Sequence, residues 1–264
     1  METDRTRPLA LVTGASSGIG FELARQFAAG GFDLVIAAED DELTAAAEQL
    51  RREGARVEAV QVDLAAASGP DELYQRVLDT GQLDAAALNA GIGAGGAFAT
   101  DTELDKELAL VDLNVRSTVH LAKYVVADMV GRGSGRVLFT SSIASTIPGA
   151  FQAVYNASKS FVQSFALALR NELNDTGVTV TSLMPGPVET EFFERAGMQD
   201  TKIGASEKDD PAEVARDGFD ALMAGDERVV SHSWSTKAQG IGSRVLPDSV
   251  KAESHRRQAK PGSA

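Results

Sequence analysis

Short apolar stretches alternate along the chain with longer stretches whose apolar residues recur at helical spacing. The short stretches are apolar along their whole length, as expected of strands in a parallel sheet that is covered on both faces. Repeated strand–helix units predict an α/β fold in which helices flank both faces of a doubly wound parallel β-sheet. The expected strands are 9–13, 33–37, 57–62, 85–89, 136–140 and 178–184, and the expected helices are 19–29, 41–53, 71–79, 104–130 and 154–174.

The chain of 264 residues shows no internal repeat and no linker between two halves. An α/β fold of this length commonly forms one domain with a large core, so we expect a single domain over residues 1–250. Within it, residues 189–208 form a long segment that could close as a lid. Residues 231–246 are expected to pack a short strand or helix against the sheet. The basic, polar residues 251–264 are expected to form a mobile C-terminal tail.

Composition narrows the classes of function. The chain has no cysteine, which excludes disulfides, thiol nucleophiles and thiolate metal sites and fits a reducing compartment. Its three histidines are scattered, so no metal is expected. The net charge of −13 disfavours binding to nucleic acid or to an anionic membrane, because these partners are also negative. No apolar leader or membrane-spanning stretch stands out, and we expect a cytoplasmic protein.

A glycine-rich turn follows the first expected strand, with the sequence Thr13-Gly14-Ala15-Ser16-Ser17-Gly18-Ile19-Gly20. Glycines at such a strand-to-helix turn permit a tight bend and let backbone N–H groups approach a pyrophosphate at the positive end of the helix. The spacing is G-x-x-x-G-x-G, not the G-x-G-x-x-G of the common dinucleotide fingerprint. The turn could be only a tight connection, but its position after the first strand favours nucleotide binding.

Tyr155 and Lys159 lie four residues apart, and Ser142 precedes Tyr155 by thirteen residues. In a helix this spacing places Tyr155 and Lys159 on one face, so the Lys ammonium would lie near the Tyr phenol. A free phenol has a pKa of about 10. A neighbouring cation lowers that pKa, which makes Tyr155 a candidate general acid or base. Taken alone, however, the spacing is more typical of a solvated Tyr beside a surface Lys.

As an ordered set, the motifs of the chain resemble those of the short-chain dehydrogenase/reductase family. The resemblance covers residues 13–190 and implies a Rossmann-type domain that binds a dinucleotide. It also implies an NAD(P)-dependent oxidoreductase that interconverts a secondary alcohol and a ketone by hydride transfer. The motifs are the glycine turn, Val62-Asp63-Leu64, Asn89-Ala90-Gly91, Asn114, Ser142, Tyr155 with Lys159, and Pro185-Gly186-Pro187-Val188-Glu189-Thr190.

The resemblance implies four catalytic residues. Tyr155 would donate a proton to the carbonyl during reduction, or remove one from the alcohol during oxidation. Lys159 would lower the pKa of Tyr155 and hydrogen-bond the nicotinamide ribose. Ser142 would hold the substrate oxygen, and Asn114 would help to link Lys159 to a chain of waters. The hydride chemistry itself belongs to the cofactor.

The resemblance also implies a set of cofactor contacts. Asp63 would accept a hydrogen bond from the adenine amino group, while Val188 and Thr190 would contact the nicotinamide. Each contact has a structural alternative, because Asp63 could cap the next segment, Asn89 could fix a turn and Thr190 could begin a helix. The implied cofactor-binding residues are Gly14, Ser16, Ser17, Gly18, Ile19, Gly20, Glu39, Asp63, Leu64, Asn89, Ala90, Gly91, Tyr155, Lys159, Pro185, Gly186, Val188 and Thr190.

Two positions depart from the family pattern. Leu88 stands where relatives often have Asn, inside a strand, and is expected to affect packing more than chemistry. Relatives that use NADP usually carry Arg just after the second strand, whereas this chain has Glu39, whose carboxylate would accept hydrogen bonds from the ribose and repel a 2′-phosphate. We therefore expect NAD rather than NADP. Arg51 or Arg52 could still swing toward the phosphate, and residues 40–42 could simply begin a helix.

The substrate is expected to be a small carbonyl or alcohol compound, bound between residues 143–152, 92–97 and the segment after Gly186. These stretches are mainly apolar, with Gln152 as a polar candidate, so an apolar ketone or secondary alcohol would fit. The same apolar side chains could equally belong to the core. They are Ile143, Ile147, Phe151, Phe192, Phe193 and Met198.

Two other functions share parts of this pattern. A 3-oxoacyl carrier-protein reductase has every motif, although the acidic chain disfavours docking to an acidic carrier. A non-catalytic nucleotide-sensing protein on the same scaffold would commonly lack Tyr155 or Lys159, and both are present. The resemblance also implies a homodimer or homotetramer built on the helices expected over 104–130 and 154–174.

Overall fold

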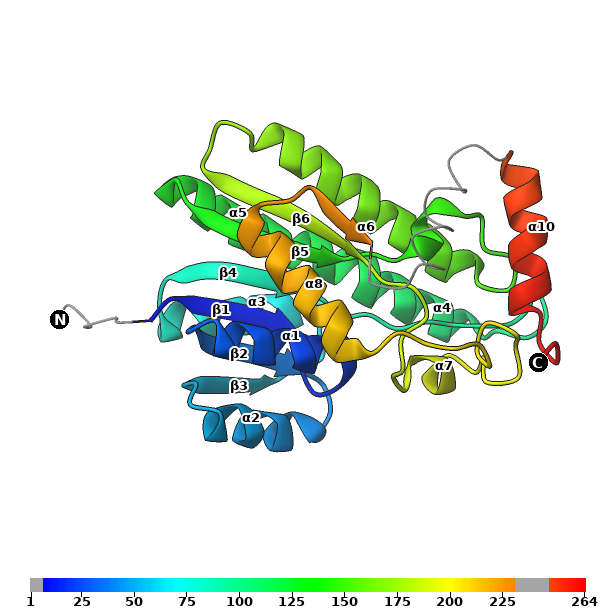
Figure 1. Cartoon of the computed structure of the whole chain (residues 1–264), viewed down its shortest axis with the longest axis horizontal. Coiled ribbons are helices and arrows are strands. Elements are labelled where there is room, and N and C mark those ends of the chain that lie inside the picture. The colour runs from blue at the N-terminus through cyan, green and yellow to red at the C-terminus, as the bar shows by residue number, and fades with distance from the viewer. Residues whose placement is uncertain (1–6, 231–246) are drawn as a thin grey trace.

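The computed structural model describes residues 7–230 and 247–264. Within them, seven parallel strands form one sheet in the order β3-β2-β1-β4-β5-β6-β7 (Figure 1). This arrangement confirms the expected α/β fold. The strands are β1 (Leu9–Thr13), β2 (Asp33–Ala38), β3 (Val57–Gln61), β4 (Leu83–Leu88), β5 (Gly135–Thr140), β6 (Val178–Met184) and β7 (Arg228–Val230).

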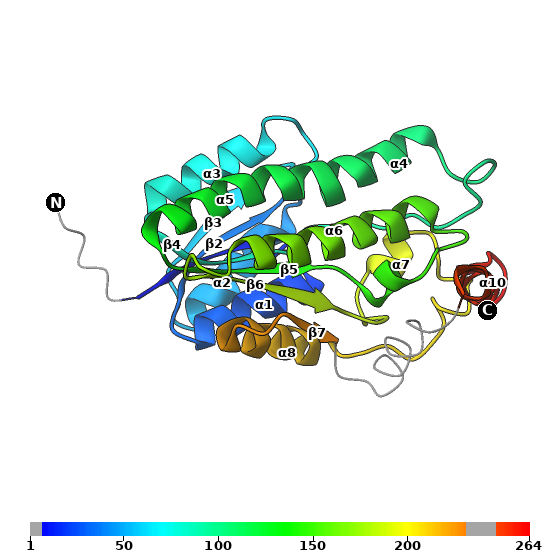
Figure 2. The same ribbon diagram turned by 90° about the horizontal axis from the view of Figure 1, so that it is seen from above.

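Helices cover both faces of the sheet (Figure 2). On one face lie α1 (Gly18–Ala29), α2 (Glu42–Arg52) and α8 (Pro211–Ala224), and on the other lie α3 (Gly69–Thr80), α4 (Leu104–Val111), α5 (Thr118–Arg132) and α6 (Ala153–Glu172). Successive residues of a strand point to opposite faces. In β1, Leu9 and Leu11 therefore join the core under α5 and α6, whereas Ala10 and Val12 join the core under α1 and α8. Burial on both sides explains why the strands are apolar throughout.

Helix α8 and strand β7 follow the segment in which the sequence predicts a lid, and the sequence analysis placed no element there. The start of α8 nevertheless carries a clear local signal: Asp210 accepts a hydrogen bond from Ala212 N at 2.8 Å, and Pro211 occupies the first turn. The helix ends at Gly225, in the left-handed region at φ 74°. Both ends of α8 could therefore have been predicted from side-chain type alone.

The helix expected over 104–130 is divided by a π-helical turn, η1 (Asp112–Ser117), that joins α4 to α5. The Thr118 hydroxyl donates to the Asn114 carbonyl at 2.9 Å, and the Ser117 hydroxyl donates to the Leu113 carbonyl at 2.5 Å. These side chains supply partners for carbonyls in the widened turn. Such turns occur often at functional sites, and this one contains Asn114.

The C-terminal segment differs from the expected tail. Residues Asp248–Ala259 form helix α10, which lies at the end of the molecule remote from the start of β1 (Figure 1), and its Ala259 packs with Phe193 of α7 (Phe192–Arg195). His255 and Ala259 are buried one helical turn apart, and Ile203 N donates to Gln258 O at 3.1 Å. Two buried positions in an otherwise polar helix leave no apolar stripe in the sequence, so periodicity did not reveal α10. Residues 231–246, for which a strand or helix is expected, lie outside the described residues.

The strand order places a crevice at the carboxyl ends of β1 and β4. Both strands sit at the middle of the sheet, and the chain leaves β1 toward β2 on one side and β4 toward β5 on the other. Connections that diverge in this way leave room between them, which is where open α/β sheets bind ligands. In the part of the chain described by the structure, no helix combines the length and the hydropathy needed to cross a membrane.

Candidate active site

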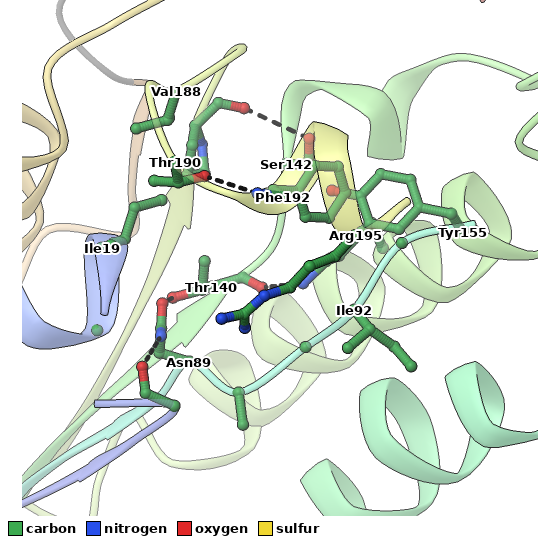
Figure 3. Close-up of a pocket in the computed structure, with 18 of the residues that line it drawn as sticks. Ile19, Asn89, Ile92, Thr140, Ser142, Tyr155, Val188, Thr190, Phe192 and Arg195 are labelled. Atoms are coloured by element: carbon green, nitrogen blue, oxygen red, sulfur yellow. Dashed lines mark hydrogen bonds between the residues drawn. The ribbon is translucent and has the colours of Figure 1, made fainter. Parts of the chain in front are cut away.

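One cleft at the carboxyl edge of the sheet brings together the residues that the sequence singled out. Figure 3 shows Ile19 of α1, Asn89 after β4, Ser142 after β5 and Tyr155 of α6 on its walls. All the expected cofactor-binding residues line this cleft, as do three of the four expected catalytic residues. The fourth, Asn114, does not line the cleft but hydrogen-bonds to the backbone of Ile92, which does.

The glycine turn is shaped for close approach of a ligand to the backbone. A Cβ atom on Gly20 would lie 1.9 Å from the Gly14 carbonyl oxygen, so no larger residue fits there. Gly14 has φ +65°, and a Cβ atom on it would lie 2.9 Å from the Ala90 backbone. The N-cap residue Ser17 makes no side-chain cap to α1, so the first N–H groups of the helix remain available to an anion. These features fit the diphosphate of a dinucleotide.

Hydrogen bonds tie the ends of three strands together beneath the cleft. The Thr13 hydroxyl accepts from the backbone N–H groups of Asn89 and Ala90, each at 3.0 Å. The Asn89 amide donates to Thr13 O at 3.1 Å, and its oxygen accepts from the Thr140 hydroxyl at 2.9 Å. Asn89 therefore fixes the backbone, as the structural alternative to cofactor binding expects, and it also lines the cleft. The sequence analysis did not single out the supporting role of Thr13 and Thr140.

Tyr155 and Lys159 share one buried face of α6, with exposed fractions of 9% and 6%. The Lys159 ammonium donates to the Thr140 carbonyl at 2.9 Å and lies 6.0 Å from the centroid of the Tyr155 ring. Ser142 follows β5, and its hydroxyl donates to the Pro185 carbonyl at 3.4 Å while accepting from Ala144 N at 3.1 Å. The structure thus brings the predicted triplet together, and the pair is not a solvated surface pair.

Burial controls the protonation of both groups. It raises the pKa of Tyr155 to about 12, and the nearby Ser142 hydroxyl opposes this rise. It lowers the pKa of Lys159 to about 8. The sequence analysis expected Lys159 to lower the pKa of Tyr155, whereas here burial outweighs that effect. With this pKa, Tyr155 is protonated at neutral pH.

Asn114 fixes the loop after β4 against α6. Its side-chain oxygen accepts from Ile92 N at 2.9 Å, and its amide donates to Ile92 O at 2.9 Å and to the Ser158 hydroxyl at 3.1 Å. A Cβ atom on Gly91 would lie 3.1 Å from the Asn114 oxygen and 3.2 Å from Lys159 Nζ. The backbone of Gly91 therefore passes between Asn114 and Lys159, and only a small residue fits without displacing one of them.

The structural alternatives for Asp63 and Thr190 are also present. Asp63 accepts from Ala65 N at 2.7 Å, and the Thr190 hydroxyl accepts from Phe192 N at 3.3 Å, at the start of α7. Both residues nevertheless line the cleft. Capping and ligand contact are compatible, because each carboxylate or hydroxyl oxygen can take part in more than one hydrogen bond.

The end of the cleft that follows β2 is acidic. Glu39 is exposed, and Asp40 accepts from the Ser16 hydroxyl at 2.8 Å and from Glu42 N at 3.1 Å. Asp40, which the sequence analysis treated only as a helix start, lines the cleft with Glu39. The side chains of Arg51 and Arg52 point elsewhere: Arg51 donates to Val57 O at 2.7 Å, and Arg52 pairs with Glu48 at 3.6 Å. Neither Arg lines the cleft.

The apolar side chains expected around a substrate divide into two groups. Phe192 lines the cleft, with its ring centroid 5.2 Å from that of Tyr155, whereas Phe151 and Met198 do not line it. Phe151 and Met198 belong to an apolar cluster with Ala259 against which Phe192 also packs. Ile143, Ile147, Gln152 and Phe193 also line the cleft. Further lining residues come from the loop after β4, the lid segment and α10, where no periodic pattern marks them. They are Ile92, Gly93, Glu191, Arg195, Ile203, His255 and Gln258.

Leu88, where relatives often carry Asn, is buried at the end of β4 in the core under α5 and α6. Its side chain packs against the apolar layer and does not line the cleft. The presence of Leu88 in place of the family's Asn therefore affects the packing of the core and not the lining of the cleft.

Comparison with known proteins agrees with the geometry of the cleft. Residues 8–201 match the family model described as short chain dehydrogenase. The chain is 30% identical to Oxidoreductase UcpA of Salmonella typhimurium over 264 aligned residues, covering 93% of this chain and 97% of that protein. A short-chain dehydrogenase from Sphingobium yanoikuyae in complex with NADPH superposes with a TM-score of 0.79 and 29% identity, covering 90% of this chain and 93% of that one.

A second solved structure is the bulky-bulky ketone specific alcohol dehydrogenase from Comamonas testosteroni. It superposes with a TM-score of 0.76 and 26% identity, covering 90% of this chain and 92% of that chain. The match to the family model spans β1 to β6, the glycine turn and the Tyr155–Lys159 helix. The chain therefore belongs to the short-chain dehydrogenase/reductase family and is an oxidoreductase.

Proposed function

We propose that the protein is an NAD-dependent oxidoreductase that interconverts a secondary alcohol and a ketone, with Tyr155 as general acid and base. The observation that carries this proposal is the convergence of Tyr155, Ser142 and Lys159 beside the glycine turn in one cleft. The tight glycine turn, in which Gly20 has no room for a Cβ atom, and the uncapped start of α1 fit a dinucleotide. When bound there, the nicotinamide supplies or accepts the hydride.

The residues of the chain orient the substrate and handle its proton. The Tyr155 phenol, which is protonated at neutral pH, gives its proton to the carbonyl oxygen during reduction. The Ser142 hydroxyl is placed to hold the same oxygen, since it lies at the end of β5 next to the buried phenol. Ile143, Ile147 and Phe192 exclude water from the reacting carbon.

Lys159 and Asn114 have supporting roles in this proposal. Lys159 is held by Thr140 O on the cofactor side of the phenol, where its ammonium is in position to bind the nicotinamide ribose. Asn114 holds the backbone at Ile92 and the Ser158 hydroxyl, and Ser158 in turn donates to Tyr155 O at 2.7 Å. Asn114 thus keeps the helix of Tyr155 and Lys159 in register with the loop after β4.

The neighbouring structures support the reaction class and the type of cofactor. The Comamonas protein is named for its action on ketones, and the Sphingobium protein holds NADPH. Because the second binds the phosphorylated cofactor, the preference for NAD rests on this chain alone. Glu39 and Asp40 both line the end of the cleft after β2, and their carboxylates disfavour a 2′-phosphate while accepting hydrogen bonds from ribose hydroxyls.

Replacing Tyr155 by Phe tests the proton donor. We expect kcat/KM for ketone reduction to fall by about a thousandfold, because a general acid typically contributes ~10²–10⁴ in rate. Binding of NADH, followed by quenching of protein fluorescence, should change little. Tyr124→Phe is the matched control, since Tyr124 donates to Asp71 on an exposed part of α5. Retained turnover in Tyr155→Phe would disprove the assigned role.

The pH dependence tests the state of Lys159. Its pKa is lowered to about 8 in the free protein, so the ammonium is present below that pH and lost above it. We expect kcat/KM for NADH, which reports ionisations of the free enzyme, to be constant near neutrality and to fall by up to tenfold per pH unit above about 8. In Lys159→Arg this alkaline limb should disappear, because a guanidinium stays protonated. A wild-type profile that is flat to pH 10 contradicts this expectation.

Cofactor titration tests the acidic end of the cleft. We expect the dissociation constant to be lower for NADH than for NADPH, and Glu39→Arg to move the ratio toward NADPH by about tenfold or more, since an added Arg pairs with the phosphate. Glu42→Arg, whose residue begins α2 and does not line the cleft, controls for net charge. Tighter binding of NADPH by the wild-type protein would overturn the preference.

We also propose that the protein forms a homodimer or homotetramer through the outer face of α4 to α6. Leu104 and Leu108 of α4 are 67% and 51% exposed, and Phe161 of α6 is 39% exposed. Exposed apolar patches of this kind are typical of interfaces.

Light scattering coupled to size exclusion tests this assembly. We expect the mass of a dimer or tetramer for the wild-type protein and a lower mass for Leu108→Glu, since a buried unpaired charge disfavours association. Leu78→Glu, at a 50% exposed position on α3, should leave the mass unchanged. A monomeric wild-type protein at micromolar concentration would refute the proposal.

A further inference from the structure

Two buried polar side chains, Gln152 and His255, lie on the substrate side of the cleft. Gln152 is the N-cap residue of α6, three positions before Tyr155, and His255 belongs to α10. They are 4% and 6% exposed, and both line the cleft. Apolar side chains surround them on this side of the cleft. The charged side chains of Glu191 and Arg195, which also line it, already form an ion pair with each other at 2.5 Å.

A hydrogen bond fixes the orientation of the His255 ring. Its Nδ1 lies 3.0 Å from the Ala150 carbonyl oxygen. A carbonyl oxygen only accepts, so Nδ1 must carry the hydrogen. Burial lowers the pKa of His255, which keeps the ring neutral at neutral pH. Nε2 therefore bears a lone pair and acts as an acceptor, and it has no hydrogen-bond partner in the part of the chain that the structure describes.

The Gln152 side chain is likewise without a protein partner among the described residues, although its backbone is fully used. Gln152 N donates to Gly149 O at 3.1 Å, and Gln152 O accepts from Asn156 N at 2.9 Å. Gln152 is 4% exposed as a residue and lines the cleft, so its amide is suited to a ligand that supplies both a donor and an acceptor.

The backbone beside Gln152 is strained and held in place by α10. Phe151 has φ 64°, the only positive value at a non-glycine residue in the described ranges. Three contacts maintain it: His255 binds the preceding carbonyl, Phe151 O accepts from Gly96 N at 2.9 Å, and the Arg256 guanidinium lies 5.3 Å from the Phe151 ring. Such strain is concentrated at ligand sites. The hydrogen bond from His255 ties α10 to the backbone two residues before Gln152, and both residues line the same cleft.

The chemistry of the two side chains selects between ligand groups. A hydroxyl satisfies both, since it donates to the His255 Nε2 and accepts from the Gln152 amide. A methyl group leaves both polar groups buried and unpaired. A carboxylate offers acceptors only and would place its charge against the Nε2 lone pair. A hydroxyl therefore fits this pair better than either alternative.

We propose, on the basis of the function proposed above, that Gln152 and His255 bind a hydroxyl of the substrate, so that the enzyme acts on hydroxyketones and the corresponding diols. Gln152 precedes Tyr155 by nearly one helical turn, a rise of about 5 Å. The bound hydroxyl consequently lies a few carbon atoms from the reacting carbonyl. Gln152 and His255 are specificity residues in this assignment, and Tyr155 remains the proton donor.

Three matched ketones test the assignment. 5-Hydroxy-2-pentanone carries the hydroxyl, 2-hexanone replaces it by a methyl group, and 4-oxopentanoate has a carboxylate in that region. We expect the wild-type enzyme to reduce the hydroxyketone with a kcat/KM at least about tenfold above those of the other two, because sites built around a substrate hydroxyl discriminate strongly against analogues that lack it. Equal values for the hydroxyketone and 2-hexanone would overturn the proposal.

Two variants then test whether Gln152 and His255 cause the preference for the hydroxyketone. In Gln152→Leu and in His255→Phe, the ratio of kcat/KM for 5-hydroxy-2-pentanone to that for 2-hexanone should fall toward one. Gln152→Leu leaves the His255–Ala150 hydrogen bond in place and so does not disturb the docking of α10. Arg257→Ala, on an exposed position of α10 that pairs with Glu253, is the matched control and should keep the wild-type ratio. A ratio that survives both Gln152→Leu and His255→Phe would refute the role of the pair.

A binding measurement separates this inference from the proposed function. Saturation-transfer NMR of 5-hydroxy-2-pentanone with the NAD⁺-loaded enzyme reports binding without turnover, because the oxidised cofactor has no hydride to transfer to a ketone. Loss of this signal in Gln152→Leu, with no reduction of any ketone, would support the hydroxyl site and contradict the proposed function. Turnover of all three ketones at similar rates would support the proposed function and contradict the hydroxyl site. Absence of both binding and turnover would overturn both.

Discussion

The hydrogen bonds of Asn89 are the constraint on which the rest of the site depends. One side chain joins the ends of β1 and β5 from its own position after β4, through Thr13 O and the Thr140 hydroxyl. The carbonyl of Thr140 then holds the Lys159 ammonium, and Lys159 sits one turn from Tyr155 on α6. The glycine turn after Thr13 and the proton donor on α6 are thereby set relative to one another through three side chains. A shift at Asn89 would move both halves of the site.

Burial of the catalytic pair has opposite effects on its two members. Desolvation disfavours charge, so it raises the pKa of Tyr155 and makes the Lys159 ammonium easier to lose. The Thr140 carbonyl partly offsets the second effect by accepting a hydrogen bond from the ammonium. Burial is therefore the main influence on the pKa values of both groups.

The parts of this structure that sequence predicts are those in which one local pattern determines the outcome. The strands at 9–13 and 178–184 are found with the expected bounds, because burial on both faces demands unbroken apolar runs. The π-helical turn at Asn114 leaves no trace in the 3.6-residue period, since it depends on hydroxyl groups at Ser117 and Thr118. Tyr155 and Ser142 follow from motif order, but the pKa of Tyr155 depends on burial that spacing does not report. Asp40 and His255 become visible only when β2 and α10 are placed beside the cleft.

The cleft has two walls of different origin. The wall formed by the strand ends lies within residues 8–201, the range matched by the family model, and its geometry is fixed by backbone hydrogen bonds of the sheet. The opposite wall includes α10, which lies beyond that range and packs on the lid segment through Ile203 and Ala259. The family match therefore includes the proposed proton donor and the glycine turn but not His255. Because His255 also fixes the strained backbone before Gln152, the proposed hydroxyl site implies that a change in the C-terminal helix would alter substrate choice without touching Tyr155 or Lys159.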